Sequence, residues 1–191
     1  MLILAAGGSR RLGRPKQLVR LGGRSLLRRA ASRALELDPA WVGVVLGAQA
    51  TRAAVELRGL RVTAIPALDW RRGLAASLRA GMRRVPATAT HVLLIALDQW
   101  AVSSGDLARL LAQRGRVPVA ARYEGILGVP ALFPRRWWRA LARLDGDRGA
   151  RALLRASHAI GVNLPSAAED LDTPAALNRL RRIPRRELNI K

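Results

Sequence analysis

The strongest evidence on the fold is the stretch LILAAGGSRRLGRPK, residues 2–16. Residues 2–6 form a short apolar run, which is typical of a buried strand. Glycines, arginines and a lysine follow at once. Glycine lets backbone N–H groups converge on an anion, and Arg and Lys attract that anion. The stretch therefore predicts a strand that leads into a loop able to bind phosphate.

Outward from this stretch, apolar runs of strand length alternate with segments of helical periodicity. We expect strands at 2–6, 42–46, 61–65, 92–97, 117–121 and 159–162, and helices at 25–37, 51–57, 73–82, 105–111, 135–144, 147–156 and from 174. This order is typical of a mainly parallel sheet with helices on both faces. The sequence predicts a single α/β domain with a three-layer, Rossmann-like fold. The domain spans residues 1–180, with a small antiparallel insertion near 122–133 and a basic C-terminal tail at 181–191.

The 191-residue chain carries a net charge of +21, from 34 Lys and Arg against 13 Asp and Glu. Such a charge favours polyanion binding in general. The arginines are scattered, however, and many fall on the outer faces of predicted helices, where a solvated polar face explains them. We therefore do not expect nucleic acid as a partner.

Composition also limits where the protein can act. No apolar run approaches the roughly 18 residues of a membrane span, and the start lacks the pattern of a secretion signal. Cysteine is absent, which excludes disulfides and thiol chemistry. We expect a cytoplasmic protein that does not insert into a membrane.

The glycine spacing excludes two widespread nucleotide loops. No Gly-Lys-Ser/Thr follows Gly13, and the pattern Gly-x-Gly-x-x-Gly is missing. A glycine-rich surface turn is the alternative to a binding loop. Two observations favour binding: the loop follows the first strand, where open α/β sheets hold ligands, and it contains Lys16, the one lysine besides Lys191.

Residues 4–16 resemble the signature of small nucleotidyltransferases, LAAGxSxRxGxPK. Within that superfamily, Ala5-Ala6-Gly7 with Pro15-Lys16 is more similar to molybdopterin (molybdenum cofactor) cytidylyltransferases than to guanylyltransferases, so the resemblance implies CTP rather than GTP. It also implies the nucleotidyltransferase form of the fold, with Arg11 and Lys16 holding the β and γ phosphates. The nucleotide contacts implied are Leu4, Ala5, Ala6, Gly7, Gly8, Ser9, Arg11, Lys16 and, on a later helix, Ser77.

Asp98 and Asp172 are the candidate metal ligands. Asp98 follows the apolar run 92–97, where the sheet should end beside the loop, and Mg²⁺ takes few carboxylates when phosphate oxygens complete its coordination. Asp170 and Asp172 have an alternative role at the positive end of a final helix that Thr173 caps. The resemblance favours the metal, because Asp98-Gln99 is similar to the family's Asp-Gln-Pro and residues 170–174 match its Asp-x-Asp-Thr-Pro. Arg11, Lys16 and Asp98 are then the implied catalytic residues.

Three further segments match the family in order. They are Trp70, Gly73, Ser77 and Gly81; Gly125, Gly128, Pro130 and Phe133; and Gly146, Asp147, Arg148, Gly149, Ala150 and Arg151. The chain departs from the family at two positions, since Trp100 stands where proline is usual and Val129 where histidine is usual. Both departures concern the acceptor side of the pocket.

The resemblance implies a Mg²⁺-dependent transfer of CMP from CTP to the phosphate of molybdopterin, with release of pyrophosphate. The expected partners are the nucleoside triphosphate, a phosphorylated pterin-like acceptor, and a molybdoenzyme or cofactor-delivery chaperone. A guanylyltransferase and a cytidylyltransferase for another phosphorylated acceptor are alternatives. A non-catalytic protein that binds nucleotides or polyanions is an alternative of a different class.

Overall fold

The structure of the protein is a computed structural model that describes residues 1–146 and 150–182. In this part of the chain, the main sheet has seven strands in the order β5-β4-β1-β6-β8-β7-β9. The strands are β1 (Leu2–Ala5), β4 (Gly43–Leu46), β5 (Thr63–Pro66), β6 (His91–Ala96), β7 (Val119–Tyr123), β8 (Ile126–Pro134) and β9 (Ile160–Asn163). The expected mainly parallel sheet is confirmed.

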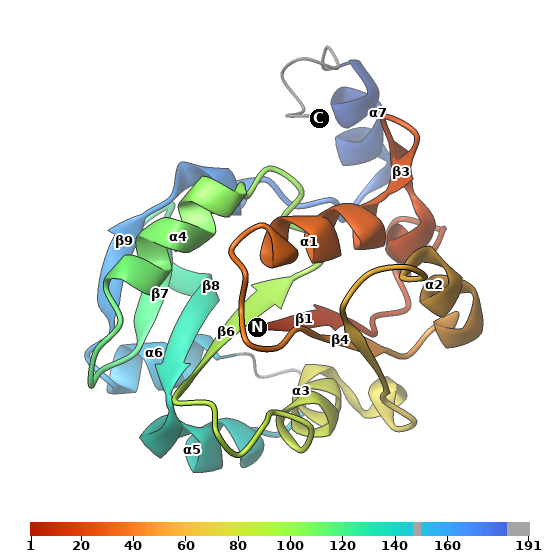
Figure 1. Ribbon diagram of the computed structural model, residues 1–191. Helices are drawn as coiled ribbons and strands as arrows, with labels where there is room; N and C mark the ends of the chain where they lie inside the picture. Colours follow the sequence, from red (N-terminus) through yellow and green to blue (C-terminus); the bar gives the residue numbers. More distant parts are fainter. Residues whose placement is uncertain (147–149, 183–191) are drawn as a thin grey trace.

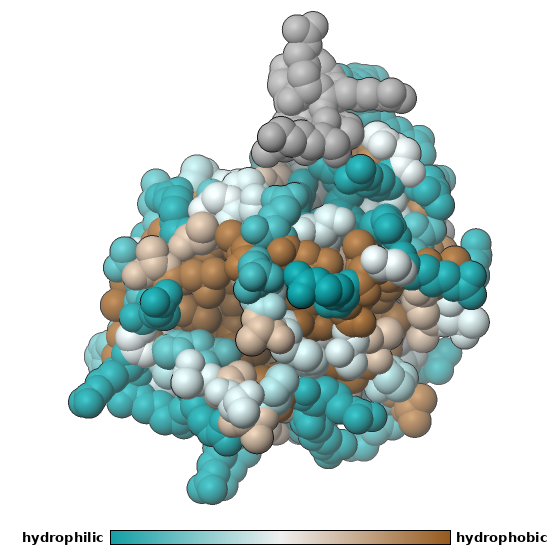
Figure 2. All heavy atoms as spheres, in the orientation of Figure 1, coloured by the Kyte–Doolittle hydropathy of each residue, from teal (hydrophilic) through white to brown (hydrophobic). Residues whose placement is uncertain are grey.

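Helices cover both faces of the sheet (Figure 1). One layer contains α1 (Leu26–Leu35), α2 (Ala50–Glu56), α4 (Ser104–Ala112) and α7 (Pro174–Arg182), and the other contains α3 (Leu74–Met82), α5 (Trp138–Ala142) and α6 (Arg151–Ala156). Short 3-10 turns are η1 (Lys16–Leu18), η2 (Trp70–Arg72), η3 (Arg135–Trp137) and η4 (Pro165–Ala168). In Figure 2 a brown apolar band runs between teal outer surfaces, as expected of a sheet between amphipathic helices.

β1 lies at the centre of the fold. It pairs in parallel with β4 on one side and with β6 on the other. Its side chains alternate between the layers: Ile3 packs in the core under α1 and α4, and Leu2 packs in the core under α3. Parallel neighbours end at the same edge of the sheet, so the loop after β1 and Asp98 after β6 emerge together.

The antiparallel part lies in the sequence where it is expected, near residues 122–133, and it forms part of the main sheet. β8 runs antiparallel to both β6 and β7 and lies between them in the main sheet. The chain can fold straight back because Glu124 and Gly125 take positive φ in the turn. Ala131 and Leu132 of β8 are then buried in opposite cores. A separate small antiparallel sheet is formed by β2 (Arg20–Leu21) and β3 (Arg24–Ser25).

One predicted helix and the predicted C-terminal tail lie partly outside the described residues. Of the helix expected at 147–156, residues 147–149 lie outside them, and α6 begins at Arg151. α7 continues to Arg182, past the expected domain end at residue 180, and the remaining tail residues 183–191 also lie outside them. None of the described helices combines the length and apolarity that crossing a membrane requires.

Gly81 and Gly105 are helical glycines in opposite environments. A Cβ on Gly81 would lie 2.7 Å from Leu2 Cδ2 and 2.8 Å from Val45 Cγ2, whereas a Cβ on Gly105 would meet nothing closer than Ser103 Oγ at 3.6 Å. We expect Gly81→Ala to lower the free energy of unfolding by about 1–3 kcal/mol through overpacking. Gly105→Ala should leave it unchanged or raise it by up to about 1 kcal/mol. Urea denaturation measures both, and equal effects would contradict the close approach of α3 to the sheet.

Candidate functional site

A cavity of about 620 Å³ opens where β1 and β6 end. Every residue that the sequence predicts for the site lines it: Leu4, Ala5, Ala6, Gly7, Gly8, Ser9, Arg11, Lys16, Ser77, Asp98 and Asp172. Its lining also includes residues that sequence analysis did not select, among them Gln17, Arg71, Leu74, Leu78, Leu94, Ala96 and Leu97. The fold therefore brings to one cavity segments that lie far apart along the chain, from residue 4 to residue 172.

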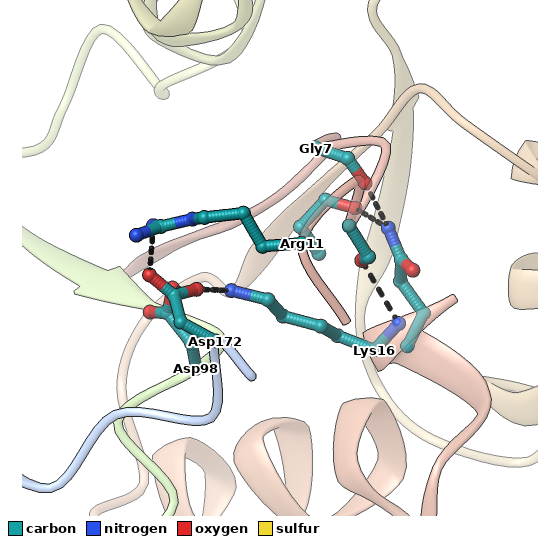
Figure 3. Close-up of polar contacts among 8 residues, drawn as sticks. Gly7, Arg11, Lys16, Asp98 and Asp172 are labelled. Carbon is teal, nitrogen blue, oxygen red and sulfur yellow. Dashed lines mark hydrogen bonds and ion pairs between the residues drawn. The ribbon is translucent and has the colours of Figure 1, made fainter. Parts of the chain in front are cut away.

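The phosphate loop, residues 6–15, is held at both ends by side-chain hydrogen bonds. Gln17 is 1% exposed, and its Nε2 donates to the carbonyls of Ala5 at 2.7 Å and Gly7 at 3.0 Å. The Lys16 backbone N–H donates to Ser9 Oγ at 3.0 Å. These bonds close the loop so that Gly7 and Gly8 line the cavity (Figure 3).

Lys16 lies between two carboxylates. Its Nζ is 2.9 Å from Asp98 Oδ2 and also bonds Asp172 Oδ1, while Arg11 Nη2 bonds the other oxygen of Asp172 (Figure 3). Burial lowers the pKa of the Lys16 ammonium, but Asp98 and Asp172 together outweigh burial and hold that pKa above its ordinary value. Lys16 therefore remains a cation in this network. The Arg11 side chain is 73% exposed and lies on the solvent side of it.

Backbone contacts bring the two carboxylates together. The Asp98 carbonyl accepts from the Trp100 N–H at 2.8 Å and the Leu171 N–H at 3.0 Å. Burial, reinforced by the charges of Asp172 and Asp98, raises the pKa of neighbouring Asp170. Thr173 caps α7 as expected, because its Oγ1 accepts from the Ala176 N–H at 3.2 Å. Asp172, one residue before this cap, contacts Lys16 and Arg11.

The pair Asp98 and Asp172 fits a divalent cation. One ammonium contacts an oxygen of each carboxylate, so the two side chains can share a cation. Mg²⁺ takes one or two carboxylates together with phosphate oxygens and waters. Across residues 1–146 and 150–182, no three His, Asp or Glu side chains gather into a metal site. A divalent ion held here would therefore draw its other ligands from phosphate and water.

Trp70 supports the phosphate loop from the side. A Cβ on Gly8 would lie 3.1 Å from the Trp70 ring, and a Cβ on Gly47 would lie 2.6 Å from Trp70 Cβ. The Arg71 guanidinium stacks 4.7 Å from the centre of the same ring. The glycines are thus needed for close packing at this place. Sequence analysis missed Arg71 because one arginine does not stand out in an arginine-rich sequence. It missed Gln17 because no sequence pattern distinguishes this residue from its neighbours.

The two departures from the family pattern have contacts of their own. Arg33 Nη1 donates to the Trp100 carbonyl at 2.6 Å, which ties the loop after Asp98 to α1. Val129 lines the cavity, and its carbonyl accepts from Gln99 Nε2 at 2.7 Å. In the third matching segment, Ala150 lines the cavity, whereas Asp147, Arg148 and Gly149 lie outside the described residues.

Comparison with known proteins identifies the family. Residues 1–160 match the family described as MobA-like NTP transferase domain. The chain is 34% identical to nicotine blue oxidoreductase of Paenarthrobacter nicotinovorans, over 94% of each protein. It is 31% identical to the molybdenum cofactor guanylyltransferase of Rhizobium meliloti (strain 1021), over 90% of this chain and 82% of that protein.

Solved structures have the same fold. Rv0371c from Mycobacterium tuberculosis H37Rv superposes with a TM-score of 0.77 at 31% identity, over 95% of this chain and 97% of that one. A structure of Rv0371c in complex with manganese gives a TM-score of 0.77 at 26% identity, over the same shares of both chains. The family match and the guanylyltransferase relative agree on the family, and the solved structures agree on the fold. The chain therefore belongs to the MobA-like NTP transferase family and is a nucleotidyltransferase.

Proposed function

We propose that the protein transfers CMP from CTP to the terminal phosphate of molybdopterin and releases pyrophosphate, with Mg²⁺ as its cofactor. The observation that carries the proposal is the network of Arg11, Lys16, Asp98 and Asp172 in one cavity. Two cationic side chains suit a triphosphate, and two carboxylates suit the metal that accompanies it. The cytoplasm is the proposed compartment, with a molybdoenzyme or a delivery chaperone as the proposed recipient of the product.

In the proposed mechanism, an oxygen of the acceptor phosphate attacks the α-phosphorus of the nucleotide, and pyrophosphate leaves. The attacking phosphate is already ionised, so no general base is needed. Mg²⁺, when bound by Asp98 and Asp172, would supply neutralisation of phosphate charge. Lys16 leaves the carboxylates and moves toward the β and γ phosphates, where it and Arg11 stabilise the charge that develops on pyrophosphate.

The choice of CTP depends on the loop residues Ala5, Ala6 and Gly7, whose pattern is similar to that of cytidylyltransferases. GTP is the main alternative, because one relative is named a molybdenum cofactor guanylyltransferase. Another phosphorylated acceptor is also compatible with the cavity, since Val129 occupies the position of the usual histidine on the acceptor side. Nucleotide and acceptor must therefore be tested together.

An oxidoreductase function is the second candidate. Nicotine blue oxidoreductase is named as an oxidoreductase, and it is similar to this chain over almost its whole length. Leu78, Leu94 and Val129 make part of the cavity wall apolar, which suits an aromatic ligand. NADH consumption with nicotine blue as oxidant, in the absence of Mg²⁺, tests this candidate.

The decisive experiment measures pyrophosphate release from CTP, GTP, ATP and UTP, with and without molybdopterin. We expect release that is selective for CTP, requires both molybdopterin and Mg²⁺, and stops when EDTA removes the metal. Asp98→Ala should abolish release, because the metal loses a ligand. Selective release from GTP would replace the nucleotide assignment, and no release from any nucleotide would contradict the proposed function.

Lys16→Met tests the charge assigned to the triphosphate. We expect turnover to fall by about a hundredfold, because the variant loses a cation that opposes the charge on departing pyrophosphate. Lys16→Arg, which keeps the charge and changes its shape, should lose less. Circular dichroism confirms that both variants are folded. If Lys16→Met turned over CTP at the wild-type rate, the assignment of Lys16 would be wrong.

Gly7→Ala tests the approach of the nucleotide to the loop. A Cβ on Gly7 meets no protein atom within 4 Å, so the methyl group enters the cavity without disturbing the fold. We expect affinity for CTP to fall by about tenfold because the methyl keeps the ligand from the loop backbone. Isothermal titration calorimetry measures the change. Gly105→Ala, in α4 and not lining the cavity, is the matched control and should bind CTP like the wild type.

A further inference from the structure

Gln99 is a buried polar residue beside the candidate site. It is 7% exposed, and its Nε2 donates to the carbonyls of Val129 in β8 at 2.7 Å and Ala167 in η4 at 2.8 Å. These partners lie 30 and 68 positions away along the chain. One side chain therefore joins the end of β6 to two other segments of the fold.

The backbone around Gln99 reaches the same C-terminal segment. Gln99 and Asp170 form an isolated antiparallel bridge, and the Leu171 N–H donates to the Asp98 carbonyl. Asp172 follows directly and extends its carboxylate to Lys16 (Figure 3). The hydrogen bond to Ala167 thus anchors the segment that supplies the second carboxylate to the strand end that supplies the first.

The amide of Gln99 has one favourable orientation. If its nitrogen and oxygen changed places, the oxygen would face two carbonyl oxygens, neither of which can donate. In the favourable orientation Oε1 is buried and has no hydrogen-bond partner among the described residues. A buried unpaired oxygen costs free energy, and an apolar side chain of similar size would avoid that cost. The use of Gln here therefore depends on the two bonds that Nε2 donates.

Gln17 has the same chemistry at another place in the site. It too is buried, it donates through Nε2 to two carbonyls, those of Ala5 and Gly7, and its Oε1 is also buried without a partner. Gln17 holds the phosphate loop, whereas Gln99 holds the segments that carry the carboxylates. The two residues make the same kind of hydrogen bonds but support different parts of the site, so one can serve as the control for the other.

We propose that Gln99 is a positioning residue, which sets the separation of the Asp98 and Asp172 carboxylates and fixes both against the cavity wall at Val129. This rests on the proposed function, because the separation matters when the carboxylates share a divalent cation. Groups that orient metal ligands without touching the metal change its affinity by about 10–100-fold. Gln99 positions Asp172 through its side-chain hydrogen bond to the Ala167 carbonyl and its backbone bridge to Asp170.

The test compares Gln99→Met with Gln17→Met. For Gln99→Met, we expect the Mg²⁺ concentration that gives half-maximal pyrophosphate release to rise by about tenfold, with the KM for the nucleotide changed less than about twofold. For Gln17→Met, we expect the KM for the nucleotide to rise and the Mg²⁺ concentration for half-maximal release to stay nearly unchanged. Without ligands, hydrogen exchange of residues 167–172 should become faster in Gln99→Met and stay as in the wild type in Gln17→Met, because only the first variant releases Ala167.

The proposal would be overturned if, in folded Gln99→Met, the half-maximal Mg²⁺ concentration and the KM for the nucleotide rose equally. An unchanged Mg²⁺ requirement in that variant would overturn it as well. A merely structural role would lower the free energy of unfolding without separating the two constants. If Gln99→Met does not fold, Gln99→Asn serves, because its amide stays neutral but is one methylene shorter and cannot reach both carbonyls. Should the wild type release no pyrophosphate, the proposed function fails. The exchange experiment then still decides whether Gln99 holds the segment, and unchanged exchange would reject that as well.

Discussion

The parallel pairing of β1 with β4 and β6 fixes where the loops that form the cavity leave the sheet. β1 lies in the middle of the sheet with a hydrophobic core on each face, so its direction and register have little freedom. Because its neighbours run the same way, the phosphate loop, the turn at Gly47 that supports Trp70, and Asp98 all emerge at one edge. The cavity is a consequence of this shared edge.

Within the cavity, the arrangement of charges matters more than the net charge of +21. Lys16 is a compact cation that fits between Asp98 and Asp172, whereas the longer, forked Arg11 reaches Asp172 from the solvent side. The two cations and two carboxylates balance one another before a ligand arrives. Under the proposed function, a triphosphate with its metal would replace both sets of contacts at once, since the metal would take the carboxylates and the phosphates would take the cations.

The C-terminal segment completes the site from outside the part of the chain that matches the family, residues 1–160. Asp172 reaches the cavity because residues 167–171 are joined to Asp98 and Gln99 by side-chain and backbone hydrogen bonds. The positions that depart from the family pattern belong to the same connected region. Arg33 donates to the Trp100 carbonyl and Gln99 donates to the Val129 carbonyl, so the backbone is held at both positions although the side chains differ from the family pattern.

The alternation of strands and helices, the loop at residues 6–15, and Asp98 at the end of a strand can be predicted from the sequence, because they follow from local periodicity and glycine chemistry. Packing in the folded chain places β8 antiparallel between β6 and β7, and brings Lys16 to Asp172 across 156 positions. The roles of Gln17 and Gln99 in holding the site were decided there too. Strand order and such contacts arise from packing between distant segments, and that packing leaves no periodic pattern along the chain.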